Sequence, residues 1–259
     1  MKFWTIFRPA TGLMAGLVLF LALGAKAQTT NGLSDSEIEG RKLAQRFLEQ
    51  RPATNSTLTG TLKIRDENGI RSEIPMKFEI IVTPTNWTSV YQKTLLTNKV
   101  AFEKLVVVHD GSGSNQYEMT LVSTNHLPHI LKRSEVVDKL HFAGDFWAMD
   151  LGLEFFHWPA QKVLKKEFRR NCACQVLEST NPNPNAFPNL PDYSRVVSWI
   201  DEDSGGIVQA EAYDARGQLL KEFAPKSFKK VNGQWELQEM EIRNVQTGSR
   251  TRLEFDLPK

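Results

Sequence analysis

Five histidines are the first residues of the chain that could bind a metal or move a proton: His109, His126, His129, His141 and His157. His126 and His129 form the one suggestive spacing, in the run His-Leu-Pro-His. Pro128 disfavours the regular helix that would align both rings, and no cysteine or acidic residue lies beside them. Zinc sites have more ligands at defined spacings. We therefore expect neither a metal nor another cofactor.

The two cysteines, Cys172 and Cys174, lie two residues apart in a predicted strand, so both side chains point to one face. A strand rises roughly 3.3 Å per residue, which places their Cα atoms near the upper limit for an unstrained disulfide. Three interpretations stay open: two small packed side chains, a strained disulfide formed in an oxidising compartment, or a redox pair. Redox proteins more usually carry C-x-x-C at the start of a helix, and this chain has no such motif.

No other pattern predicts catalysis. The chain has no G-x-S-x-G motif. The run from Gly111 to Ser114 indicates a turn, because no Gly-Lys-Ser/Thr follows it as in a phosphate-binding loop. The carboxylates are scattered. We therefore expect a protein that is not an enzyme, and a thiol-redox enzyme that uses the cysteine pair is the least favoured alternative.

The most informative segment is an apolar run that follows Asp145. Asp145 is a suitable helix N-cap and Pro159 prevents continuation, so we predict a helix over residues 145–156, with a break or kink at Gly152. Its apolar residues do not keep to one face, and such a helix must be covered on all sides. Either it passes through the core, or it forms a lid between the protein and an apolar ligand.

The first 27 residues predict export from the cytoplasm. Lys2 and Arg8 precede an apolar stretch from Ala10 to Leu23, and Ala25-Lys26-Ala27 is a suitable cleavage site, with the cut after Ala27. The apolar stretch is shorter than the roughly 20 residues of a membrane-spanning helix, so we favour a signal peptide over a membrane anchor. The residue directly after the cut is Gln28 and not a cysteine, so we do not expect a lipid anchor on this chain.

Charge argues against nucleic acid as a partner. Three of the 32 basic residues lie in the segment to be removed, which leaves 29 against 30 acidic residues in the mature chain. Nucleic-acid-binding domains normally show a basic excess. We expect a single domain over residues 28–259, which is long enough for a substantial core.

Alternation of apolar and polar residues predicts a mainly β protein. After a helix that opens at Ser34 and ends near Gln50, the period changes to two, beginning with Leu58, Leu62 and Ile64. Asn68-Gly69 predicts a hairpin turn, and further strands are expected through residue 122 and from residue 165 to the end. We expect long antiparallel strands.

Four segments resemble the outer-membrane lipoprotein-sorting proteins, that is, the LolA-like periplasmic lipoprotein carriers. The first segment is Gly144-Asp145-Phe146 with Asp150-Leu151, and the second is Cys174-Gln-Val-Leu177-Glu178. The third runs from Tyr193 through Trp199-Ile-Asp201 to Lys221, and the fourth from Met240 to Thr251. The sequence departs from the family in the extra Cys172 and in the apolar run from Phe155 to Trp158. The resemblance covers about residues 140–256.

The resemblance implies a half-open antiparallel β-barrel, or strongly curved sheet, with helices covering its open mouth and a hydrophobic cavity for acyl chains. We expect the strands and the predicted helix to line this cavity, in the inward register. The candidate lining residues are Phe78, Ile80, Tyr91, Val107 and Met119 from the strands, and Phe146, Trp147, Met149, Leu151, Phe155 and Trp158 from the lid.

Our first hypothesis is therefore a monomeric periplasmic carrier that shields the acyl chains of lipoproteins, or of another lipid, on the way to the outer membrane. Its partners would include an inner-membrane donor and an outer-membrane acceptor. The alternative is an envelope sensor or assembly module with the same fold, because a fold does not fix a function.

Overall fold

The computed structural model describes residues 32–94, 102–110, 113–122, 129–132, 141–184 and 192–258. The predicted signal peptide, residues 1–27, and His126 lie outside these residues. Within them, no helix is long and apolar enough to cross a membrane.

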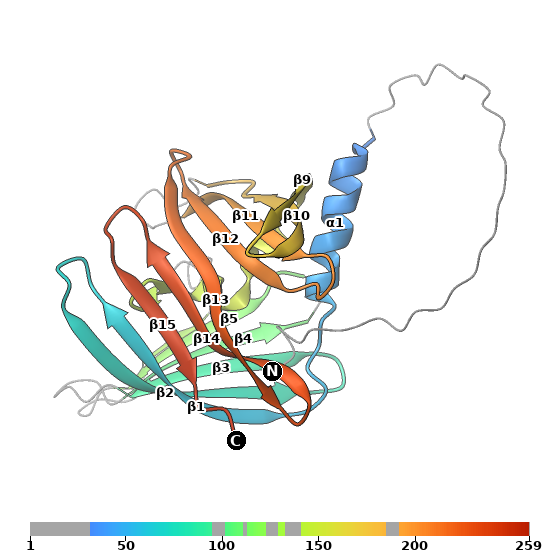
Figure 1. Ribbon diagram of the computed structural model, residues 1–259. Coiled ribbons are helices and arrows are strands. Elements are labelled where there is room, and N and C mark those ends of the chain that lie inside the picture. The colour runs from blue at the N-terminus through green and yellow to red at the C-terminus, as the bar shows by residue number, and fades with distance from the viewer. Residues whose placement is uncertain are drawn as a thin grey trace, which may run out of the picture.

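The first element is the helix α1 (Asp35–Leu48), as predicted. Its start is fixed by Ser34, whose backbone N–H donates to the carboxylate of Glu37 at 2.8 Å. Gly40 lets the helix approach the edge of the sheet, because a Cβ there would lie 2.6 Å from the backbone nitrogen of Lys162. Figure 1 shows α1 beside the sheet edge.

Thirteen strands form one antiparallel sheet in the order β6-β5-β4-β3-β2-β1-β15-β14-β13-β12-β11-β10-β9. The first meander comprises β1 (Ser56–Arg65), β2 (Arg71–Val82), β3 (Trp87–Thr94), β4 (Phe102–His109), β5 (Gln116–Val122) and β6 (His129–Lys132). The second comprises β9 (Ala160–Arg169), β10 (Cys172–Thr180), β11 (Tyr193–Asp201), β12 (Ile207–Asp214), β13 (Leu219–Val231), β14 (Gln234–Asn244) and β15 (Arg250–Phe255).

The sheet is strongly curved and open (Figure 1), and β6 and β9 are the two end strands of its order. Shifts of register between β9 and β10, β11 and β12, and β13 and β14 mark bulges, which increase bending and twist. The prediction of a mainly antiparallel, half-open curved sheet is confirmed.

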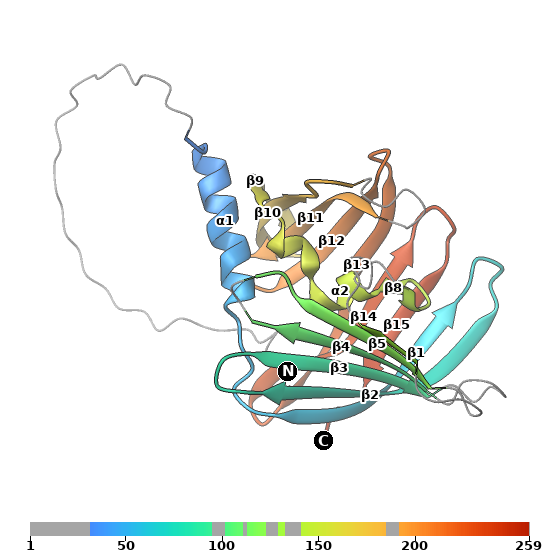
Figure 2. The same ribbon diagram turned by 180° about the vertical axis from the view of Figure 1, so that it is seen from behind.

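Residues 141–158, which lie between the two edge strands in sequence, cross the concave side of the sheet. This segment, His141–Trp158, contains β7 (His141–Ala143), β8 (Phe146–Trp147), α2 (Ala148–Gly152) and the 3-10 helix η3 (Glu154–His157). Figure 2 shows β8 and α2 lying across the hollow of the sheet. We call this segment the plug.

The prediction of one helix over residues 145–156 is wrong in form. The α-helix begins only after Trp147 and ends at Gly152, and its C-cap, Leu153, takes a left-handed conformation with φ of 51°. Gly152 packs against Tyr117, whose hydroxyl would lie 2.2 Å from a Cβ at that position. Tertiary contact with β5 therefore divides the apolar run into two short helices, at the glycine where the sequence indicated a break.

Candidate functional site

The plug fills the concave face of the sheet with apolar side chains. Ala148 is fully buried, and Phe146, Met149 and Phe156 are at most 2% exposed. The ring of Phe156 stacks on Phe47 of α1 with 4.5 Å between centroids. The plug is therefore packed against both the sheet and α1.

The structure brings the candidate lining residues together. The strand residues Phe78, Ile80, Tyr91, Val107 and Met119 belong to one buried cluster that also contains Phe146, Trp147, Met149, Leu151 and Phe155. Trp158 is partly buried and packs against the same cluster. These side chains form the interface between plug and sheet, and their role in ligand binding stays a prediction.

A buried ion pair fastens α2 to the second meander. Lys221 of β13 is 2% exposed, and its Nζ lies 3.2 Å from Oδ2 of Asp150 and 3.4 Å from the centre of the Trp147 ring. The hydroxyl of Tyr193 donates to Oδ1 of Asp150 at 2.7 Å. Burial lowers the pKa of Lys221 to about 8, although the Asp150 carboxylate acts to raise it. Burial is also the main cause that raises the pKa of Tyr193.

Sequence reasoning missed the role of Lys221. Its position in the strand could have indicated this role. Leu219, Lys221 and Phe223 are spaced two residues apart, so the lysine lies on the same face of the strand as two apolar residues. Asp150 and Tyr193 were noted only as residues of the resembling segments.

The first meander holds the plug on both sides of Asp150 in the sequence. The hydroxyl of Tyr117 donates to Glu154 at 2.8 Å, and the side-chain amide of Asn115 donates to the Gly152 carbonyl at 2.8 Å. Lys93 donates to the carbonyl of Phe142 and pairs with Glu103 at 2.8 Å, with both side chains about nine-tenths buried. Each half of the sheet therefore binds the plug through buried polar groups.

A small cavity separates the plug from the second meander. Its volume is about 20 Å³, which is room for about one water molecule. Asp150, Tyr193 and Lys221 are its polar lining residues, and its apolar lining includes Leu153, Phe155, Val196, Ala210, Phe223 and Ile242. We call it the Lys221 pocket.

The resembling segments meet in space at the turns of the second meander. Asp145 accepts hydrogen bonds from the hydroxyls of Ser249 at 2.6 Å and Thr251 at 3.1 Å, which fixes the start of the plug. The prediction that Asp145 caps a helix is therefore wrong. Asp145 instead links the plug to the turn between β14 and β15.

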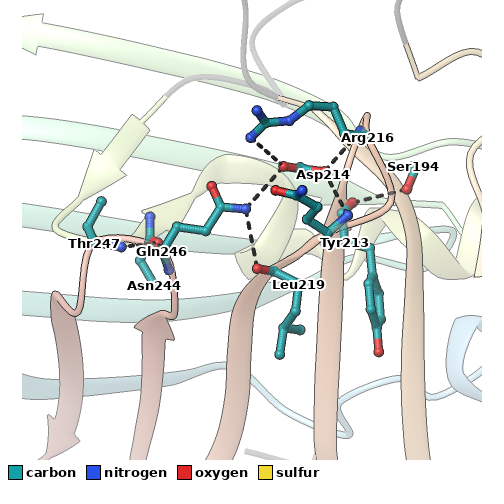
Figure 3. A network of polar contacts seen from close by, with 9 residues as sticks. Ser194, Tyr213, Asp214, Arg216, Leu219, Asn244, Gln246 and Thr247 are labelled. Atoms are coloured by element: carbon teal, nitrogen blue, oxygen red, sulfur yellow. Dashed lines mark hydrogen bonds and ion pairs between the residues drawn. The ribbon is translucent and has the colours of Figure 1, made fainter.

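Other residues of the resembling segments build that turn and the turn between β12 and β13. Figure 3 shows the Asp214 carboxylate between Arg216 and Gln246, and the Gln246 amide donates to Asp214 at 3.0 Å. The same amide nitrogen donates to the carbonyl of Leu219 at 3.3 Å, while Asn244 accepts from the backbone of Thr247 at 3.1 Å. These contacts join the β12–β13 and β14–β15 turns, and Asp145 bonds to Ser249 of the second turn.

Both cysteines are free thiols in the structure. Cys174 is buried against Val176, Val197 and Trp199, and Cys172 packs against the same cluster. Burial raises the pKa of Cys174 to about 11, which lowers its thiolate fraction near neutral pH. The disulfide that the spacing permitted is not formed here, and the geometry agrees with two packed side chains.

The described residues contain no group of three or more His, Cys, Asp or Glu that could hold a metal ion. The absence of a metal stays a prediction, because His126 lies outside these residues. His109 has another environment: its ring stacks on Trp87 with 3.7 Å between centroids, and its Nε2 lies 3.1 Å from the Ser89 hydroxyl.

His109 is expected to make the protein less stable in acid. Burial lowers its pKa from 6.5 to about 3. Between these values the unfolded chain binds a proton that the folded chain excludes, so the free energy of unfolding falls as the pH falls, by up to about 1.4 kcal/mol per pH unit. Urea unfolding at pH 7 and pH 5 should show a smaller difference for His109→Gln than for the wild type. Equal differences would contradict this assignment.

Comparisons with known proteins address the fold. A family model described as "Uncharacterized protein" matches residues 140–259. None of the curated proteins matches the chain.

Three solved structures are similar over most of the chain. A domain assigned to outer membrane lipoprotein sorting from Vibrio parahaemolyticus has 20% sequence identity and a TM-score of 0.69, with 85% of this chain and 92% of that chain covered. A DUF1329 family protein from Desulfovibrio piger has 18% identity and a TM-score of 0.68, with 86% and 92% covered. A LolA superfamily protein from Nitrosomonas europaea has 14% identity and a TM-score of 0.57, with 87% and 96% covered. The chain therefore has the curved-sheet fold of the LolA-like lipoprotein-sorting proteins.

Proposed function

We propose that the protein carries lipids across the periplasm and shields their acyl chains on the concave face of its sheet. The proposal rests on the way in which the concave face is covered. The plug, a short segment, closes this apolar face, and a few polar contacts hold the plug in place. The protein acts in this proposal by binding, without catalysis.

The physical argument starts from the cost of an exposed acyl chain, about 0.8 kcal/mol for each CH₂ group. Ligand pockets generally measure about 300–1,000 Å³, whereas the Lys221 pocket has about 20 Å³. A chain can therefore enter this pocket only if the plug moves. The apolar plug residues then exchange their contacts with the sheet for contacts with the ligand or with solvent.

The fold of the lipoprotein-sorting proteins supports a lipoprotein as the cargo, delivered from an inner-membrane donor to an outer-membrane acceptor. Residues 1–27, as a signal peptide, would bring the chain to that compartment. We propose that the carrier works as a monomer, since one chain provides both the concave face and its cover.

The experiment is native mass spectrometry of the mature protein, purified gently from the envelope, followed by lipid extraction. We expect bound acylated lipid or lipoprotein on the wild type and much less on Ala210→Phe, because the added ring fills the Lys221 pocket. Ala210 is 4% exposed, and the control Ala224→Phe places the same ring at an alanine that is 8% exposed and does not line this pocket.

Both variants should cost about 1–3 kcal/mol through overpacking, so a difference between them reports on the pocket. A lipid-free wild type, under conditions that retain lipid on a known binder, would overturn the proposal. Equal lipid on the two variants would place the ligand elsewhere.

A further inference from the structure

Lys221 is a charged group in an otherwise apolar wall. Its Nζ reaches the plug through Asp150, and the Trp147 ring covers it at 3.4 Å. Tyr193 lies on the same side, with its ring centre 5.3 Å from Nζ. The partners that compensate this cation, Asp150 and the face of Trp147, both belong to the segment that must move when a ligand enters.

Movement of the plug removes that compensation. Lys221 and Tyr193 belong to the sheet and stay in place, while Asp150 leaves with α2. A buried ammonium without a partner is strongly unfavourable, and the Tyr193 hydroxyl loses its acceptor at the same time. An anionic oxygen in the place of the Asp150 carboxylate would restore the interactions with both Lys221 and Tyr193.

We propose that Lys221 and Tyr193 form a recognition site for the negatively charged head group of an acyl ligand, a carboxylate or a phosphate, which replaces Asp150 when the plug opens. The ammonium and the phenol would both donate to it. The acyl chain would lie along the apolar lining, where Ala210 and Ala212 leave space beside Phe223.

The inference rests on the proposed function and narrows it to acidic amphiphiles. A neutral head group cannot form an ion pair with Lys221 and therefore binds this site with a less favourable free energy. Hydrogen bonds to charged groups are about twice as strong as neutral ones, so we expect a discrimination of about ten- to hundredfold in dissociation constant between an anionic and a neutral ligand of the same chain length.

The test compares hexadecanoate, hexadecyl phosphate and hexadecanol as competitors of a fluorescent acyl probe on the mature protein. The variant is Lys221→Met with Asp150→Asn, which removes both members of the pair and leaves no unpaired charge. The control is Lys226→Met, which removes a 3.5 Å ion pair with Glu241 that also starts from β13 and leaves Glu241 paired with Arg252 at 2.6 Å.

We expect the wild type and the control to prefer one or both anions over the alcohol, and the Lys221 variant to bind all three equally. The two anions distinguish a fatty acid from a phospholipid as the source of the charge. Equal binding of acid, phosphate and alcohol by the wild type would overturn the head-group site and leave the carrier proposal standing. Failure of all three to bind would instead reject the carrier proposal.

Discussion

Replacement of Lys221 by methionine is expected to lower the free energy of unfolding by about 3–5 kcal/mol. The methionine fills a similar volume but leaves the Asp150 carboxylate, which is about 10% exposed, without its cation. Two donors to that carboxylate remain, the Tyr193 hydroxyl and the backbone N–H of Trp147 at 2.8 Å, and they reduce the cost without removing it. Urea unfolding followed by tryptophan fluorescence measures the effect.

The second half of this prediction is a rescue. The double variant Lys221→Met/Asp150→Asn removes both charges and should recover most of the lost stability, because apolar or neutral replacement of a buried pair is often close to neutral. The single variant Lys226→Met serves as the control and should change stability by less than about 1 kcal/mol, since its pair is partly exposed. Equal instability of the single and double Lys221 variants would show that packing around the lysine, and not the pair, stabilises the plug.

Truncation of Phe155 is expected to weaken the fold and strengthen ligand binding. Phe155 is 5% exposed, lines the Lys221 pocket and packs against Phe156 with 4.5 Å between ring centroids. Phe155→Ala should cost about 3–5 kcal/mol of stability. The space left by the ring enlarges the pocket, so an acyl chain needs less movement of the plug before it can enter.

Phe255→Ala is the matched control for this truncation. Phe255 is 3% exposed and contacts Phe78 at 5.7 Å between centroids, but it does not line the Lys221 pocket. Both variants should lose similar stability in urea unfolding, and Phe155→Ala should bind a fluorescent acyl probe more tightly than the control does. Weaker binding by Phe155→Ala would mean that the ring contacts the ligand. Equal binding by the two variants would mean that the acyl chain binds outside the Lys221 pocket.

Much of the fold could be predicted because its signals are local. The capping residues of α1, the Asn68-Gly69 turn and the two-residue period from Leu58 onward each depend on near neighbours along the chain. The plug could not be predicted in the same way. Its apolar composition indicated burial, but its division into two short helices depends on the contact of Gly152 with Tyr117, a residue of another strand.

The candidate site shows the same division. The candidate lining residues on the strands follow from strand parity and those on the plug from its apolar composition, and all of them belong to one buried cluster or pack against it. The polar contacts of the site join residues far apart in sequence: Asp150 meets Tyr193 and Lys221, and Asp145 meets Ser249. The resembling segments contained these residues, yet only the fold shows that the segments hold one another.

The last strand has a consequence for the order in which the chain can assemble. Strand β15 pairs with β1 over six residue pairs, from Gly60 with Phe255 to Arg65 with Arg250, and Thr59 bonds to Asp256 across 197 residues. Each meander can form from neighbouring hairpins, but the two are joined in one sheet only when this pairing is made. Because such distant contacts are slow to form, β1 must remain an exposed edge until β15 pairs with it, and an exposed edge is a site for aggregation. The pairing of residues 250–255 with β1 therefore determines when the two half-sheets become one sheet.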